Sequence, residues 1–178
     1  MENLQKRQRK TLEELKKIFD DLKIAAQMRD KEKEELPMDV LTTLHTHVGA
    51  TSDEVLGEYF FFPPENNPVN VQYFGIGLTL SENVTESFLP QLISAVGALN
   101  YYVFIGAFTV DVAGGKLVYK LTVPMSVDLM EEEMTETANI AISSALTVVE
   151  TYTSILLRVA EGEAGVDELM EFLPVDNQ

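Results

Sequence analysis

The chain has 178 residues, with no cysteine, no tryptophan and only two histidines. The absence of cysteine excludes disulfide bonds, thiolate catalysis and cysteine-ligated zinc. With only two histidines, most catalytic triads of hydrolases are not expected. Basic residues are also scarce, because 13 lysines and arginines stand against 29 acidic residues, for a formal net charge of −16. Nucleic acids and anionic membranes attract basic surfaces, so we predict neither as a partner.

The basic residues are concentrated at the N-terminus. Residues 1–36 hold ten of them against nine acidic residues, which leaves three basic and 20 acidic residues for 37–178. The composition changes at Leu36-Pro37, where proline is also expected to stop a helix. The sequence therefore predicts a basic amphipathic helix or arm over residues 1–36 and an acidic α+β binding domain over 37–178.

Long apolar runs are missing as well. No such run follows the polar first ten residues, so we predict no secretory signal. The most hydrophobic long stretch, 138–160, contains Asn139, Glu150 and Arg158, which argues against a membrane span. With 46% hydrophobic residues the chain still has enough material for a buried core. We therefore expect a cytoplasmic protein.

The N-terminal segment has the periodicity of a helix. Its apolar residues recur three and four positions apart, which predicts one buried face: Leu12, Leu15, Phe19, Leu22 and Ala26. Residues 1–10 precede this stripe. They form either a frayed basic arm, with Thr11 as the helix cap, or an extension of the helix. Because the arm is expected to bury little surface, its deletion is predicted to leave the melting temperature nearly unchanged.

The body begins with three predicted strands, over 38–48, 55–62 and 73–80. In the first, Val40, Leu44 and Val48 are expected on one face, and His45 with His47 on the other. The third alternates strictly between apolar and small or polar residues, which is typical of a strand with one buried face. A helix follows, for which Ser87 is the expected cap.

A hairpin and a long helix complete the predicted order. Gly114-Gly115 suits a two-residue turn, because both glycines tolerate a positive φ. In that register one dry face of the hairpin is expected to carry Phe104, Phe108, Val110, Val112, Leu117, Tyr119, Leu121 and Val123. The last long helix is expected over 128–161, with a short amphipathic turn over 166–173 after it. The order helix–strand–strand–strand–helix–strand–strand–helix predicts an α+β fold. Its antiparallel five-stranded sheet is packed on one face by helices, and it ends in a long C-terminal helix.

The long helix carries two apolar stripes, although one is enough to cover a sheet. The first runs from Met134 to Val159. The second is the candidate contact with the N-terminal helix or with a second copy of the chain, and it consists of Ile142, Leu146, Val149 and Leu156. A stripe left exposed would mark an interface. We therefore expect a homodimer whose contact is apolar and strengthens with salt.

Residues with catalytic or metal-binding chemistry are few. His45 and His47 share a face of the predicted strand, and Asp39 or Glu58 could approach them, but no third ligand is evident nearby, so we predict no metal site. Ser143-Ser144 has no basic partner, and Gly75-Ile76-Gly77 is too short for a dinucleotide-binding motif. We therefore assign no catalytic residue and no cofactor.

Two stretches resemble the YbjN-like family, which shares its fold with the type III secretion chaperones: Leu92-Ile93-Ser94-Ala95-Val96-Gly97-Ala98-Leu99-Asn100 and Gly106-Ala107-Phe108-Thr109-Val110-Asp111. The resemblance implies a non-enzymatic α+β domain, often dimeric, that holds another protein or a segment of one. It transfers no functional residues, because the family offers no motif to match.

The leading hypothesis is therefore a chaperone- or adaptor-like protein-binding module. A sheet edge or an apolar groove would accept a polypeptide segment by strand addition or by side-chain docking. The alternative is a small-ligand or signalling sensor of the same fold, with a pocket between sheet and helix. An enzyme of unknown type is the third hypothesis.

Overall fold

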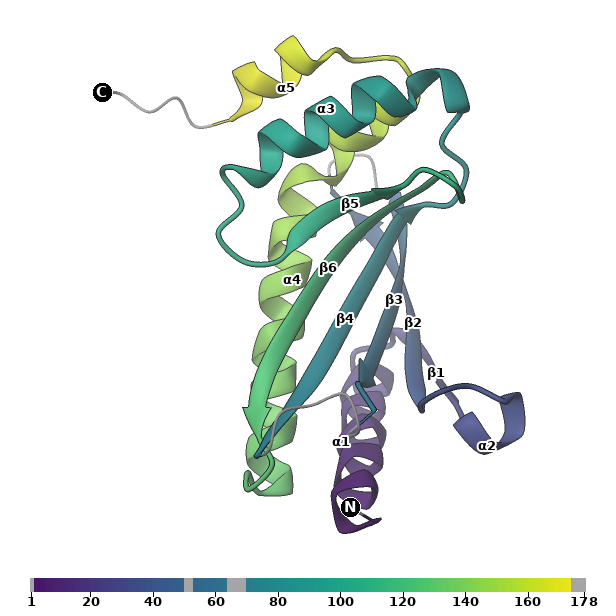
Figure 1. The fold of residues 1–178 in the computed structure, drawn as a ribbon, viewed down its shortest axis with the longest axis vertical. Helices are drawn as coiled ribbons and strands as arrows, with labels where there is room; N and C mark the ends of the chain where they lie inside the picture. The colour runs from purple at the N-terminus through teal and green to yellow at the C-terminus, as the bar shows by residue number, and fades with distance from the viewer. Residues whose placement is uncertain (1, 50–52, 64–69, 174–178) are drawn as a thin grey trace. The chain divides into compact units, whose positions relative to one another are not determined.

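The computed structural model describes residues 2–49, 53–63 and 70–173. The fold is α+β, with helices packed on a six-stranded antiparallel sheet of order β1-β2-β3-β4-β6-β5 (Figure 1). The elements are α1 Glu2–Asp21, β1 Ala25–Arg29, α2 Lys31–Glu34, β2 Val40–Val48, β3 Asp53–Phe61, β4 Val71–Ser81, η2 Glu86–Phe88, α3 Leu89–Asn100, β5 Ala107–Asp111, β6 Lys116–Ser126, α4 Glu131–Ala160 and α5 Val166–Phe172.

The first strand of this sheet was not predicted. Helix α1 ends at Asp21, Lys23 turns the chain with a φ of 60°, and β1 pairs antiparallel with β2. Ala26, expected on the helix, lies opposite Thr43 instead. Alanine fits a helical stripe as well as a strand, and here pairing with β2 outweighs helix propensity. The prediction of five strands was therefore wrong by one.

The chain divides into two compact units that interleave along the sequence. Unit 1 consists of Met1–His45, Leu56–Gly77 and Leu121–Leu146, and unit 2 consists of Thr46–Val55, Leu78–Lys120 and Thr147–Gln178. Unit 1 therefore contains α1, β1 and the first half of α4. Unit 2 contains α3, β5 and α5. These two units differ from the division at residue 37 that the change in charge predicted.

The basic N-terminus is part of the fold of unit 1. Helix α1 begins at Glu2, so Thr11 lies inside it, is fully buried and does not cap it. Gln8 is buried and donates from Nε2 to Oε1 of Gln72 at 3.0 Å. The guanidinium of Arg7 donates to the carbonyl oxygens of Val127 and Leu129 at 2.7 and 2.8 Å. The arm thus extends the helix, and the expectation that it buries little was wrong.

Strand β2 buries the face opposite to the predicted one. Leu41, Thr43 and His45 are buried, whereas Leu44 is 39% exposed. His47 has a φ of 63°, which interrupts the alternation, and Val48 beyond it is buried again. A positive φ at a histidine marks an irregularity of the strand. The prediction of one apolar face with Val40, Leu44 and Val48 was therefore wrong, because the irregularity at His47 places Leu44 and Val48 on different faces.

The hairpin of β5 and β6 was predicted with the wrong turn, and its faces were predicted correctly only in part. Phe104 and Val112, expected on the buried face, lie in the loops before and after β5 and are 92% and 58% exposed. Asp111 pairs with Lys116, so the loop has four residues rather than two. Oδ1 of Asp111 accepts hydrogen bonds from the backbone N–H groups of Ala113 and Gly114, both at 3.1 Å. This shift of two residues preserves the side-chain parity, and Phe108 and Tyr119 are buried as expected.

Helices α3, α4 and α5 lie close to their predicted positions, although Ser87 lies in η2 and does not cap α3. Helix α4 is long and apolar enough by composition alone to span a membrane, and 44% of its most apolar 18-residue window is buried within the chain. On its second stripe, Ile142, Val149 and Leu156 are buried and Leu146 is half-buried. Three of the four residues proposed as a dimer contact therefore present no surface to a partner.

Candidate interaction surface

The two histidines lie in different environments. His45 is buried, and its Nε2 lies 2.8 Å from both Oγ1 of Thr43 and the hydroxyl of Tyr59. His47 is exposed. Over the described ranges, no group of three or more histidine, aspartate or glutamate residues is placed to hold a metal ion. The hydrogen bonds of His45 thus stay within the core.

The buried cluster of Thr43, His45 and Tyr59 is enclosed by apolar groups. The ring of Phe19 stacks on Tyr59 at 5.4 Å and meets His45 edge-on at 5.8 Å. Burial lowers the pKa of His45 and raises the pKa of Tyr59. A Cβ at Gly57 would lie 2.5 Å from Oγ1 of Thr43 and 2.6 Å from the Tyr59 hydroxyl. Glycine therefore leaves the space in which these polar groups meet.

Stability is expected to fall in mild acid because of His45. Its pKa is lowered in the folded state, so protons bind the unfolded chain more tightly, and stability is lost as the pH falls below the unfolded value of about 6.5. Urea unfolding at pH 7.5 and 5.5 measures this loss. His45→Gln should reduce it and His47→Gln should not. An equal loss in both variants would assign it to other groups.

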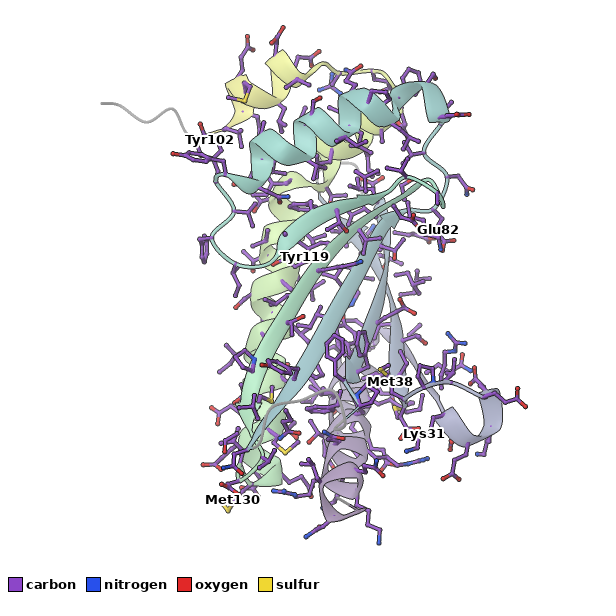
Figure 2. The ribbon with its side chains drawn as sticks, viewed as in Figure 1. Lys31, Met38, Glu82, Tyr102, Tyr119 and Met130 are labelled. Carbon is purple, nitrogen blue, oxygen red and sulfur yellow. The ribbon has the colours of Figure 1, made fainter. Side chains whose placement is uncertain are left out.

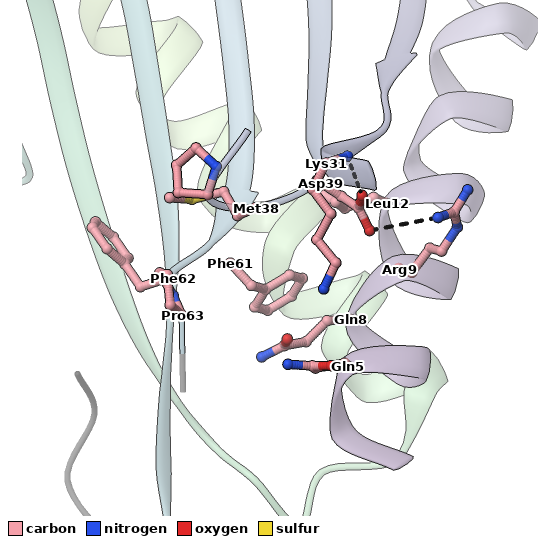
Figure 3. Close-up of a pocket in the computed structure, with 11 residues that line it drawn as sticks. Gln5, Gln8, Arg9, Leu12, Lys31, Met38, Asp39, Phe61, Phe62 and Pro63 are labelled. Atoms are coloured by element: carbon pink, nitrogen blue, oxygen red, sulfur yellow. Dashed lines mark hydrogen bonds and ion pairs between the residues drawn. The ribbon is translucent and has the colours of Figure 1, made fainter. Parts of the chain in front are cut away.

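A small pocket in unit 1 is lined in part by Arg9 and Asp39, which belong to an ion-pair network (Figure 3). Arg9 lies 3.0 Å from Asp30 and 3.8 Å from Asp39, and Asp39 accepts a hydrogen bond of 3.0 Å from the backbone N–H of Lys31. The backbone N–H of Glu32 and the Arg9 side chain lower the pKa of Asp30. The cavity volume is about 120 Å³, below the roughly 300 Å³ at which small-molecule sites begin. This network connects α1 to residues 30–39 through the ion pairs of Arg9.

The remaining sequence candidates have structural roles. Ser144 donates to the carbonyl oxygen of Ile140 one turn earlier in α4. Glu131 pairs with Lys10 at 2.6 Å. A Cβ at Gly75 would meet the ring of Phe60, so close packing explains this strand glycine. None of these contacts assembles a nucleophile with a base.

The most distinctive surface of the chain lies in unit 2 and is free of charge. Residues 87–110 contain no charged residue, although the chain has 42 in all. Helix α3 lies within this run, with Leu89, Leu92, Ala95, Val96 and Leu99 buried. Its outer face is formed by Pro90, Ile93, Ser94, Gly97 and Tyr101. Exposed helix faces usually carry charged residues. Hydrophobic periodicity does not reveal this uncharged run, although counting charges along the chain does.

The loop that follows α3 extends this surface. None of residues 101–106 is buried, and the exposed fractions reach 82% at Tyr101 and 92% at Phe104. Figure 2 shows Tyr102 pointing outward from the end of α3. The hydroxyl of Tyr119 donates to the carbonyl oxygen of Ile105 at 2.7 Å, which anchors the end of the loop. The exposed face of α3 together with this loop is called the uncharged surface below.

A groove lies at the other end of the α3 face. It runs between the start of α3 and the turn of the β5–β6 hairpin, with a volume of about 740 Å³. Leu89, Pro90 and Ile93 line one side, and residues 112–115 line the other. Val112 is largely exposed there. The groove offers an apolar side chain a place to dock.

Strand β5 stands at the edge of the sheet, but its backbone is partly capped. The side-chain amide of Asn100 donates to the carbonyl oxygen of Phe108 and accepts from its backbone N–H, both at 2.9 Å. A strand added at this edge would need the same two groups. Side-chain docking on the uncharged surface is therefore favoured over strand addition at β5.

The chain matches no protein-family model, no curated protein and no solved structure. The resemblance to YbjN-like and type III secretion chaperone-like domains therefore stays a prediction.

Proposed function

We propose that this chain is a non-enzymatic protein-binding module that holds a partner polypeptide on the uncharged surface. The exposure of Tyr101 and Phe104 beside an uncharged helix face carries the proposal. Contiguous exposed apolar groups on soluble proteins are usually interaction sites. Aromatic residues are enriched at protein interfaces, and charged residues are depleted at their centres.

A chaperone- or adaptor-like role fits this proposal. Such a protein needs a stable scaffold and an apolar surface that stays accessible. Here the loop that carries Phe104 is attached to the scaffold by hydrogen bonds from the backbone N–H groups of Tyr102 and Val103 to the carbonyl oxygen of Leu99. Its aromatic residues are thus presented by an ordered loop, which lowers the entropic cost of binding. The proposed location is the cytoplasm.

A small-ligand sensor is the second candidate. The groove beside α3 has a volume within the range of ligand sites, about 300–1,000 Å³. Among the residues that line the groove, only Asn83 and Glu86 have polar side chains, and both precede α3 in the chain. Ligand sites usually combine an apolar wall with several convergent polar groups, so this groove suits an apolar side chain better than a polar metabolite.

Photo-crosslinking in the native cell tests the proposed function. A benzophenone amino acid replaces Phe104, which is 92% exposed, and a matched variant carries it at Leu22, which is 64% exposed on unit 1. We expect discrete protein adducts at position 104 that position 22 does not give. Equal labelling at both positions, or none at 104, would overturn the proposal.

A further inference from the structure

We propose that the partner on the uncharged surface is a second copy of this chain, whose α3 lies antiparallel against the first about a two-fold axis at Gly97. This inference rests on the proposed function and names the occupant of its surface. Three observations support it. The surface carries no charge, Gly97 has no structural explanation within one chain, and the exposed Tyr101 and the groove lie at opposite ends of α3.

The distribution of charge favours a second copy of the chain over a basic partner at the uncharged surface. In a two-fold contact each surface patch faces itself, so a charged patch would meet like charge. A chain with a net charge of −16 therefore needs an uncharged patch to associate with itself, and residues 87–110 supply one. A basic partner would instead be attracted to the acidic surface elsewhere.

Gly97 has no structural explanation within the single chain. A Cβ built there meets no atom within 4 Å, and its φ lies outside the positive range. Glycine inside a helix is less favourable than alanine. Small residues at a helix surface let another helix approach closely, and Ser94 and Ala98 stand beside Gly97 on α3. A crossing helix explains the glycine.

The two ends of the α3 face complement each other. An antiparallel pair centred on Gly97 sets Tyr101 of one copy opposite Ile93 of the other. The exposed aromatic side chain thereby meets the groove lined by Pro90, Ile93 and Val112. Residues 93 and 101 are eight positions apart, or about 12 Å along the helix, so one chain cannot fill its own groove with Tyr101. In the dimer each copy fills the groove of the other, so the contact occurs once on each side of the axis.

Gly97→Gln separates folding from association. Glutamine is a better helix former than glycine, and its Cβ meets no atom of the chain within 4 Å. By light scattering in 0.5 M salt, the wild type should have twice the chain mass of 19.9 kDa. Gly97→Gln should keep its helical circular dichroism and dissociate at least about tenfold more readily. Ile140→Gln, at an exposed residue of α4, is the matched control and should stay dimeric.

A charge-pair rescue tests the register. Ile93→Glu and Tyr101→Lys should each abolish the dimer, because each buries an unpaired charge. When both substitutions are combined, the new carboxylate of one copy lies opposite the new ammonium group of the other on both sides of the axis. Dimerisation should then return at low salt and weaken at high salt. A dimer that Gly97→Gln leaves intact, or a double variant without rescue, would overturn the proposed contact.

The crosslinking experiment distinguishes the two proposals. A wild-type chain that stays at 19.9 kDa at every salt and protein concentration overturns the self-contact. If Phe104 then crosslinks to a different protein, the proposed function survives with another partner. If position 104 labels nothing, both proposals fail. Adducts of twice the chain mass that Gly97→Gln removes support both.

Discussion

Deleting residues 1–10 should lower the melting temperature by roughly 10 °C. The deletion removes the first turns of α1, the hydrogen bonds of Arg7 to two carbonyl groups, and the buried amide of Gln8. It leaves Gln72 without that partner in the core. A buried polar group that loses its partner costs about 1–3 kcal/mol. With the lost helix packing the total is about 3–5 kcal/mol, and each kcal/mol shifts a domain of this size by about 2–4 °C.

Point variants identify the cause of that loss. Gln8→Ala should account for about 1–3 kcal/mol of it in urea unfolding. Asn3→Ala, at an exposed position of the same helix, should change stability by less than about 0.5 kcal/mol. If the truncated chain melts with the wild type, the contacts of Arg7 and Gln8 contribute nothing and the N-terminus is a dispensable arm after all.

Gly106→Val should destabilise the chain by about 3–5 kcal/mol. Gly106 has a φ of 67°, where a β-branched residue is strained by about 1–3 kcal/mol. An added Cβ would also collide with the Tyr119 hydroxyl and lie 2.8 Å from the carbonyl oxygen of Lys120. Overpacking of this kind costs about 1–3 kcal/mol more.

The matched control for that variant is Gly77→Val. A Cβ at Gly77 meets only Glu58, at 4.0 Å, and its φ lies outside the positive range, so a β-branched residue fits the strand. Chemical denaturation should show little loss, or a gain. Similar losses at both positions would mean that neither the positive φ of Gly106 nor the collision of its added Cβ explains the need for glycine.

The regular parts of the fold could be predicted because they obey a simple period. Phe74, Ile76, Leu78 and Leu80 alternate along β4, and all four are buried as expected. The limits of α4 were predicted within three residues, since its stripe continues unbroken to the glycines after it. Within the paired strands of the hairpin, Phe108 and Tyr119 are on the predicted buried face despite the wrong turn, because a shift of two residues preserves side-chain parity.

The errors arose where one residue fits two patterns. Ala26 continues the helical stripe of α1 and also suits β1, and only pairing with β2 decides between them. Val40, Leu44 and Val48 suggested a buried face, but the positive φ of His47 changes the parity of β2 between Leu44 and Val48. A single sequence does not reveal such irregularities in advance.

The candidate surface was missed for a different reason. The second stripe of α4 indicates that a face is covered without showing what covers it, and here Ile142, Val149 and Leu156 are buried within the chain itself. Hydrophobic periodicity points to cores. The interaction surface instead combines exposed aromatic residues with an absence of charge, so a search for missing charge would have identified it.

The capping amide of Asn100 has a consequence for the protein in concentrated solution. Exposed sheet edges are templates on which other chains deposit as fibres. Asn100 bonds the N–H and carbonyl groups of Phe108. It thereby prevents another strand from pairing with β5 at this residue, next to the apolar loop. Its loss would appear first as turbidity and low soluble yield at high expression, before any large drop in melting temperature. Asn100 is thus expected to limit aggregation at this edge while the neighbouring uncharged surface stays exposed.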